Sequence, residues 1–314
     1  MMLIRCLALA AVASTGLSAL TWLTPLGVPD KAPVWDKVKP FGLDGTSRTF
    51  TEAELHDRLK AVDWFPNAHP PMPQPVANGH GGAGACGFCH LPDGAGRPEN
   101  AALAGLPAGY IEEQVAAFAA GQRRPPTGEW TPNTLMSKTS AEITAPEIKA
   151  AALYFSRLKF ASHVRVVEAA QIPRATPMAY VYSLDRSRME PIGVRIIEAP
   201  DAPEGFEKRD PRLHYTAFVP PGAVANGAAL ARTGGPAAQP CAACHGAGLK
   251  GGIAPPLAGR SPSYIARQLF SFRLGVRNNP GAAAMAPVAG KLSDRDVVSL
   301  AAYAASLKPL GLRP

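Results

Sequence analysis

The sequence predicts a mainly α-helical protein in which two similar domains stand in tandem, joined by a small connector with short strands. Three observations predict this fold. A cysteine and histidine motif occurs twice, a helical pattern follows each copy, and the stretch between the copies contains β-prone runs. The 314 residues leave room for about two domains, and the 46% that are hydrophobic are enough to build their cores.

The boundaries that we expect follow the order of these features along the chain. They define a leader or membrane anchor at 1–30, an extension at 31–75, a first domain at 76–158, a connector at 159–220 and a second domain at 221–314.

The N-terminus has the composition of an export signal or of a membrane anchor. Arg5 is followed by an uncharged, apolar stretch at residues 6–28. This stretch is long enough for one membrane helix, and small residues near 11–13 and at 18–19 are candidate cleavage sites. With either a cleaved leader or a retained anchor, we expect the folded part in the bacterial periplasm, either free or tethered to the inner membrane.

Each copy of the motif has the spacing C-x-x-C-H. The two copies contain four of the five cysteines: Cys86, Cys89 and His90 in the first, and Cys241, Cys244 and His245 in the second. At this spacing two thiols form thioethers with one haem, and the adjacent histidine ligates its iron. A single motif can also mark a redox pair or half of a zinc site, but the further ligands that zinc needs do not follow at short spacing. The sequence therefore predicts two covalently bound haem c groups.

A duplicated helix follows each motif. Residues 103–123 match residues 257–277 at a constant offset of 154, and the shared Tyr, Ile, Gln and Phe recur at helical spacing. Gly121 and Gly275 are expected to end the two copies, because glycine is the usual residue just beyond a helix C-terminus. The repeat predicts one middle helix in each domain.

A final helix is predicted to close each domain. The patterns Thr144-x-x-Glu147 and Ser293-x-x-Asp296 are typical of helix starts, since the hydroxyl and the carboxylate can each accept a hydrogen bond from the first turn. Their offset is 149, so the second copy has lost five residues between the two helices.

One methionine precedes each final helix, again at an offset of 149. Met136 and Met285 lie in sequence that predicts loops. A thioether can take the sixth position on a haem iron, opposite histidine. Core packing is the commoner role of methionine, but the agreement between the repeats favours iron ligands. His80, near the first motif, is the alternative ligand to Met136.

The order of these features resembles a class I cytochrome c that has been duplicated, as in the dihaem cytochromes of the c4 type. The likeness covers residues 76–158 and 221–308, and is strongest at 251–260. The resemblance implies that the carbonyl of Pro255 accepts the Nδ1–H of the haem histidine, which fixes the ring. The first domain departs from the pattern, with Ala101 at the matching place.

The first domain departs also in its N-terminal helix. Gly227 stands 14 residues before its haem cysteine, whereas the equivalent Gly79 stands only 7 before its own, so about two helical turns are missing. The first haem is then either more exposed or covered by the extension. There the pattern Thr51-x-x-Glu54 predicts a helical run to Val62.

The connector contains four short β-prone runs separated by Pro, Gly and Asp. They lie at 164–167, 179–182, 194–197 and 215–219. They predict a small strand-bearing connector, with an extended linker as the alternative.

The net charge of +8 is concentrated in the second domain. Residues 221–314 hold 10 Lys and Arg against 2 Asp and Glu, whereas residues 77–158 hold 6 against 7. Ionised haem propionates would offset part of this charge through Arg267, Arg273 or Arg277. A basic surface near a haem steers acidic redox partners, so we expect an acidic partner to dock on the C-terminal domain. A nucleic-acid partner is not expected.

These features predict an electron-transfer protein rather than an enzyme, and no catalytic residue is assigned. Two irons closed by histidine and methionine leave no open position for a substrate. The alternatives are a dihaem cytochrome c peroxidase and a haem subunit of a larger membrane oxidoreductase complex. The remaining histidines are expected at the surface or in loops: His56, His69, His163 and His214.

Overall fold

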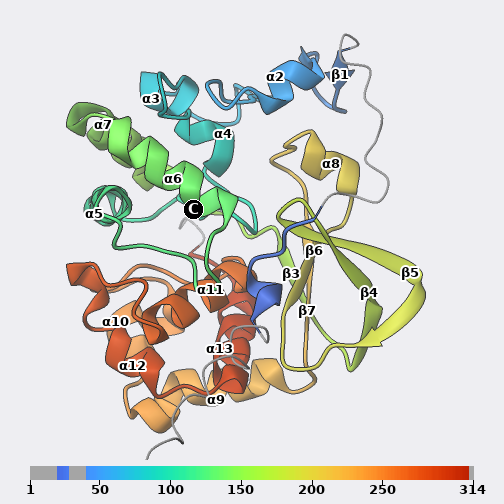
Figure 1. Ribbon diagram of the computed structural model, residues 1–314, viewed down its shortest axis with the longest axis vertical. Helices are drawn as coiled ribbons and strands as arrows, with labels where there is room; N and C mark the ends of the chain where they lie inside the picture. The colour runs from blue at the N-terminus through green and yellow to red at the C-terminus, as the bar shows by residue number, and fades with distance from the viewer. Residues whose placement is uncertain (1–19, 28–39, 311–314) are drawn as a thin grey trace, which may run out of the picture.

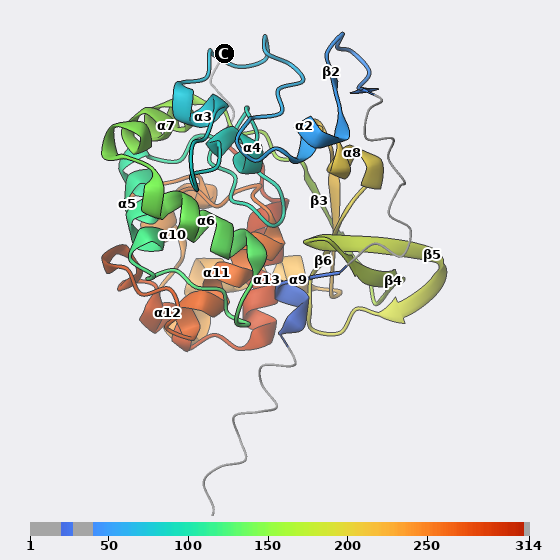
Figure 2. The same cartoon turned by 45° about the horizontal axis from the view of Figure 1, so that its top comes forward.

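The structure, a computed structural model, describes residues 20–27 and 40–310, and helices predominate in it. Figure 1 shows two helical halves stacked on each other, with the strands at one side of both. After the turn of Figure 2 the helices of the first half still lie against those of the second. No helix within the described part of the chain is long and apolar enough to cross a membrane.

The first half and the extension before it contain short elements followed by three long helices. They are β1 (Phe41–Gly42), β2 (Thr49–Phe50), α2 (Glu52–His56), α3 (Gln74–Ala77), α4 (Cys86–His90), α5 (Ala108–Ala119), α6 (Thr131–Glu142) and α7 (Ala145–Arg157).

The second half has two long helices at its centre and several single turns around them. Its elements are α9 (Ala223–Thr233), η2 (Gly235–Ala237), α10 (Ala242–His245), η3 (Ala247–Leu249), α11 (Pro262–Arg273), η4 (Pro280–Ala282), α12 (Ala286–Gly290) and α13 (Asp294–Ser306).

The predicted repeat is confirmed in the bounds of the helices. α11 begins and ends 154 residues after α5, and α13 begins and ends 149 residues after α7. Both final helices begin with the predicted capping box, in which the hydroxyl of Thr144 or Ser293 faces the third helical residue.

The two middle helices also end in the same way. Gly121 and Gly275 have the same left-handed backbone, with φ of 67° at each. The amide of the next residue donates to the carbonyl five positions back, from Gln122 to Ala117 and from Val276 to Ser271. This is a Schellman motif, and it reverses the chain after each helix. Because the chain reverses, the next residue, Arg123 or Arg277, lies beside the helix that has just ended.

The N-terminal cover of the two halves differs as predicted. α9 has 11 residues and packs along α13, whereas α3 has only 4. The extension covers the gap, because the amide of Ala85 donates to the carbonyl of Arg58 and that of Gly79 donates to Leu59. The sequence left open whether the first haem motif is exposed or covered by the extension, and in the structure the extension covers it.

The helix of the extension is shorter than predicted. Thr51 caps its start with the expected capping box, but the helix ends at His56, not at Val62. Asp57 ends it by accepting a hydrogen bond from the amide of Leu59 with its own carboxylate, which favours a turn over a further helical turn.

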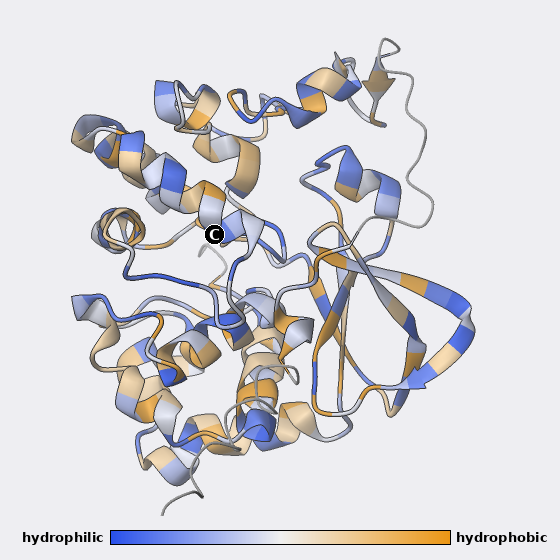
Figure 3. Ribbon diagram, in the orientation of Figure 1, coloured by the Kyte–Doolittle hydropathy of each residue, from blue (hydrophilic) through white to orange (hydrophobic). Residues whose placement is uncertain are grey.

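Most of the strands belong to the connector, which lies between the two halves in the sequence and at one side of both in space (Figure 1). The connector contains β3 (Val164–Glu168), β4 (Gln171–Met178), β5 (Val181–Pro191), β6 (Ile197–Pro200), α8 (Pro203–Glu207) and β7 (Tyr215–Val219). β7 pairs in parallel with β3 and antiparallel with β6, and β4 and β5 form a separate hairpin. Figure 3 shows hydrophilic residues at the outer end of this hairpin.

Two of the four predicted runs, at 164–167 and 215–219, are strands. The other two strands begin later than the predicted runs at 179–182 and 194–197, since β5 starts at Val181 and β6 at Ile197. β4 was not predicted, since Pro173 and Pro177 interrupt its sequence. Proline is compatible with the edge of a two-stranded sheet, where its missing N–H does not break a ladder on both sides.

One hydrophobic core joins the second half to the sheet and to the N-terminal residues. Buried side chains of α11 and α13, among them Phe270 and Val297, pack with Val219 of β7 and with Trp22 and Leu23. The first half has a core of its own around Phe155. The connector is therefore more firmly joined to the second half than to the first.

The two halves meet through a reciprocal pair of arginines. Arg123 donates from Nη2 to Gln268 Oε1 (2.7 Å) and to Tyr264 Oη (3.2 Å) of the other half. Arg277 donates from Nη2 to Gln114 Oε1 (2.7 Å) and to Tyr110 Oη (3.0 Å) in return. Tyr264 and Gln268 are the repeat equivalents of Tyr110 and Gln114. Each arginine therefore contacts the same two residues in the opposite half. This is the pattern of a two-fold symmetric interface between identical subunits.

This interface buries two like charges. Arg123 and Arg277 are both buried, and their backbones form an antiparallel bridge. Burial, and next the charge of Arg277, lower the pKa of Arg123. Gln268 Oε1 accepts from both guanidinium groups, which couples the two sites. The interface is therefore positively charged at its centre.

Gly227→Ala should destabilise the protein through the contact of α9 with α13. A Cβ atom at Gly227 would lie 2.0 Å from the carbonyl oxygen of Ser299, and backbone cannot move aside. We expect the free energy of unfolding to fall by about 1–3 kcal/mol, as for other overpacked sites, in thermal unfolding of the holoprotein. Gly109→Ala in α5 is the matched control, because its Cβ would meet open space. An equal effect of both changes would contradict this packing.

Arg123→Gln should weaken the contact between the halves. It removes two charged hydrogen bonds at once, so we expect the free energy of unfolding by urea to fall by about 2–3 kcal/mol. Because Gln268 is shared, the double variant with Arg277→Gln should lose less than the sum of the two single changes. Arg232→Gln, at an exposed position of α9, is the control. Strict additivity would show that the two arginines act independently.

Candidate functional site

Both cysteine motifs line a single cavity of about 560 Å³ between the two halves. All eight residues predicted to hold haem or iron lie along its wall. They are Cys86, Cys89, His90 and Met136 from the first half, and Cys241, Cys244, His245 and Met285 from the second. Most of the other lining side chains are apolar. The cavity thus brings together, from positions up to 199 residues apart, all the groups that the sequence singled out.

The first motif forms the short helix α4. His90, at its end, is buried and donates from Nδ1 to the carbonyl of Ala101 (2.8 Å). This leaves Nε2 as the free ring nitrogen. The ring of Phe155 stands edge-on to it, with 6.4 Å between centroids. Burial lowers the pKa of His90, which favours the neutral imidazole that a metal requires.

The second motif is arranged in the same way. Cys241 stands at the start of α10, and His245 at its end donates from Nδ1 to the carbonyl of Pro255 (2.7 Å). This is the bond that the resemblance implied. Burial also lowers the pKa of His245. The two repeats therefore fix their imidazoles by the same bond to two different residues, and Ala101 replaces proline as acceptor without loss of the contact.

The four cysteines of the motifs form no disulfide bond. Burial raises the pKa of Cys86 to about 12 and raises that of Cys241 as well. A raised pKa does not activate Cys86 or Cys241 as a nucleophile. Their position on the wall of an apolar cavity matches the requirement for thioether bonds to a large apolar ligand.

The two methionines line the cavity from different secondary structures. Met285 stands between η4 and α12, close to the predicted loop, whereas Met136 lies inside the helix α6. The loop predicted around Met136 is therefore wrong. Pro132 in the first turn starts a helix there, because proline is well suited to the beginning of a helix. In the second half, Pro287 divides the equivalent stretch into two single turns.

Of the five histidines outside the motifs, His163 lies on the cavity wall and the other four do not. His80, the alternative to Met136, is not part of the cavity wall. Its ring is 46% exposed and contacts Glu147 at 3.0 Å. His69 lies in a loop, one of the two expected settings, but only 5% of its side chain is exposed, and it contacts Asp63 and Tyr154. Those two neighbours enclose it, and the sequence pattern gave no sign of either.

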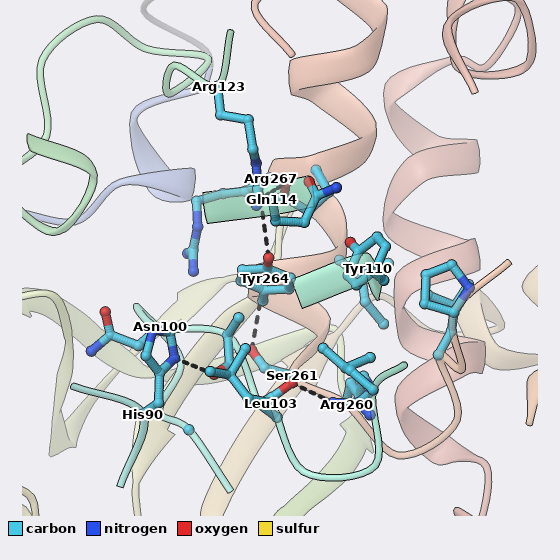
Figure 4. A pocket seen from close by; sticks show the side chains of 18 of the residues that line it. His90, Asn100, Leu103, Tyr110, Gln114, Arg123, Arg260, Ser261, Tyr264 and Arg267 are labelled. Carbon is cyan, nitrogen blue, oxygen red and sulfur yellow. Dashed lines mark hydrogen bonds between the residues drawn. The ribbon is translucent and has the colours of Figure 1, made fainter. Parts of the chain in front are cut away.

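Seven arginines add positive charge to the cavity wall: Arg58, Arg97, Arg123, Arg124, Arg260, Arg267 and Arg277. Figure 4 shows three of them, with Tyr264 and His90, around the pocket. Arg260 donates to the carbonyls of Ala104 and Pro256, and burial lowers its pKa to about 10. The sequence did not single out Arg260. The only feature of the sequence that could have indicated Arg260 is its place in the segment 251–260, where the resemblance to class I cytochromes c is strongest.

The arginines expected to meet propionates differ in position. Arg267 and Arg277 line the cavity, but Arg273 does not and instead forms an ion pair with Asp294 (2.7 Å). The Nε of Arg277 is buried without a hydrogen-bond partner. An unpartnered buried donor beside a second cation fits an anionic group of the ligand.

The donor set and the shape of the wall fit haem c. Paired thiols, a histidine whose Nε2 is free and a thioether occur twice, on a mainly apolar wall that also carries guanidinium groups. The residues present thus supply what attachment, iron ligation and propionate binding each require.

Comparison with known protein families agrees with this chemistry. Residues 224–303 match the family described as cytochrome C oxidase, cbb3-type, subunit III. A thiosulfate dehydrogenase electron acceptor from Thiomonas intermedia is 47% identical over 79 residues, which are 24% of this chain. The match spans only 35%, about a third, of that relative's length.

Two further relatives are covered over most of their length. Cytochrome c-554(548) of Halomonas halodenitrificans is 41% identical over 68 residues, 21% of this chain and 82% of the relative. Cytochrome c4 of Azotobacter vinelandii is 26% identical over 232 residues, 73% of this chain and 87% of the relative. The long alignment with a cytochrome c4 extends over both halves. The chain therefore belongs to the cytochrome c family, as a cytochrome c4-like protein with two covalently bound haem c groups.

Proposed function

We propose that each half holds one haem through its own four residues. Cys86 and Cys89 form the thioethers of the first haem, and His90 and Met136 ligate its iron. Cys241, Cys244, His245 and Met285 do the same for the second. The single observation that carries this proposal is the presence of all eight residues on the wall of one cavity. When bound, each haem supplies one-electron redox chemistry at its iron.

The protein's own residues set the conditions for that chemistry. The carbonyls of Ala101 and Pro255 hold each imidazole by Nδ1 and make it a better donor at Nε2. With haem bound, Met136 and Met285 would each supply a second protein ligand to one iron and leave no position for a substrate, and a methionine ligand would raise the reduction potential. Water is kept out by the apolar wall. This arrangement supports outer-sphere electron transfer and leaves no position for a peroxidase reaction.

We propose a periplasmic location and a partner that docks on the second half. Ile253 lines the cavity and is 91% exposed, and the exposed Lys250 lies three residues away. An exposed apolar side chain at the cavity mouth, with a cation beside it, suits an acidic redox protein. Two relatives that are named electron acceptors of thiosulfate dehydrogenase support a carrier role of this kind.

Met136→Ala and Met285→Ala should each open one iron. We expect each variant to lose the sulfur-to-iron charge-transfer absorption of one haem and to lower that haem's midpoint potential, because the sulfur ligand favours the reduced state. Optical redox titration of the purified holoprotein measures both effects. Met189→Ala, at a position that is exposed on β5, is the control. Full absorption in either cavity variant, or a wild type with high-spin iron and rapid peroxide turnover, would refute the proposed ligation.

Lys250→Glu should slow electron exchange with an anionic reagent. We expect oxidation of the reduced protein by ferricyanide to slow severalfold at low ionic strength, because attraction at the second half is lost. The difference should vanish near ~1 M salt, where the Debye length is about 3 Å. Lys149→Glu makes the same charge change on α7 of the first half and is the control. Equal rates for both variants at every salt concentration would rule out steering by the second half.

A further inference from the structure

Residues 20–27 are packed into the folded body, although the sequence marks them as the end of a leader or anchor. Leu23 is 0% exposed and Trp22 and Leu20 are buried in the core of the second half. The ring of Trp22 stands edge-on to Phe270 of α11, with centroids 6.3 Å apart. Figures 1 and 2 show this blue segment between the two helical halves and the strands. The rest of the predicted leader, residues 1–19 and 28–30, lies outside the described part of the chain.

The backbone of this segment contacts both the connector and the second half. The carbonyl of Trp22 accepts a hydrogen bond from Tyr182 Oη of β5 (3.2 Å). Gly27 and Ala179 exchange both of their backbone hydrogen bonds. The carbonyl of Leu23 accepts from Arg267 Nη1 of α11 (3.0 Å).

The segment also contacts the first half. The carbonyl of Pro25 accepts from Trp130 Nε1, just before α6 (3.3 Å). The guanidinium of Arg267 lies over the ring of Trp130, 4.6 Å from its centre, and both side chains line the cavity. The segment therefore supplies acceptors to two buried donors at the cavity wall, one from each half. Without it these two donors would be left buried and unpaired, which is costly.

The fit at Gly27 is specific to glycine. A Cβ atom there would lie 2.3 Å from the carbonyl oxygen of Pro177 and 2.9 Å from its Cβ. The pairing with Ala179 requires this close approach. A leader that is discarded after export would not need such a fit to the folded protein.

We propose that residues 20–27 are a permanent strap that is retained in the mature holoprotein, ties the two halves and the connector together, and positions Arg267 and Trp130 at the cavity. Any removal of the leader then ends before Leu20. Both candidate cleavage sites, near 11–13 and at 18–19, lie on the required side. The proposed strap does not depend on which residues ligate the irons. An experiment that disproves the strap would therefore leave the proposed haem ligation unaffected.

The mature N-terminus tests the strap directly. The full-length gene product is expressed with haem maturation, the holoprotein is purified from periplasmic and membrane fractions, and its intact mass is measured together with its N-terminal peptide. We expect a chain that begins at or before Leu20 in whichever fraction holds it. A mature chain that begins after Leu20 would overturn the proposal.

Substitutions within the strap test its role in the folded protein. Trp22→Ala should lower the Tm of the holoprotein by about 5 °C or more, since a buried aromatic contact is lost. It should also lower the midpoint potential of at least one haem, because water gains access beside Arg267. Trp22→Phe keeps an aromatic contact and should give a smaller change of the same sign, which covers the case in which Trp22→Ala does not fold.

Leu26→Ala is the matched control within the same segment, because Leu26 is 64% exposed. It should leave both the Tm and the potentials as in the wild type. If the Trp22 variants behave like Leu26→Ala in both measurements, residues 20–27 do not act as a strap.

Discussion

The hydrogen bond from Nδ1 of each motif histidine to a backbone carbonyl is the interaction on which the site depends. It fixes the ring and determines which nitrogen is free, while burial favours the neutral imidazole. The acceptor is backbone in both halves, so the bond is kept when the residue changes from Pro255 to Ala101. The path of the loop after each motif is what must be conserved, and the rest of each half holds that loop in place.

The duplication explains how two such sites come to share a cavity. The same Schellman turn follows α5 and α11, and it directs Arg123 and Arg277 back across the interface. Because both halves carry the same helix and turn, they can bind each other as two identical subunits would. The two haem sites thus face the same interior instead of opposite surfaces, which favours a short distance between the redox centres.

The interior combines an apolar wall with buried positive charge. Burial lowers the pKa of Arg260 and of Arg267 to about 10; each donates hydrogen bonds to carbonyl oxygens, and the charge of Glu198 offsets only part of the effect at Arg267. Such an arrangement is unfavourable in an empty cavity and favourable around an anion. It links the folding of the interface to occupancy by a ligand with carboxylate groups, and it accounts for part of the positive charge of the second half.

The sequence alone determined what depends on local pattern: the two C-x-x-C-H motifs, the paired helices with their caps, and the acceptor at Pro255. It could not place the single cavity, the cover of the first motif by the extension, or the buried role of residues 20–27, because these depend on contacts between distant segments. Met136 illustrates the limit, since its place on the cavity wall followed from the repeat while its helical backbone did not. Tertiary packing decided these features. An apolar run has the same sequence pattern whether it spans a membrane, is part of a cleaved leader or packs in the core of the protein.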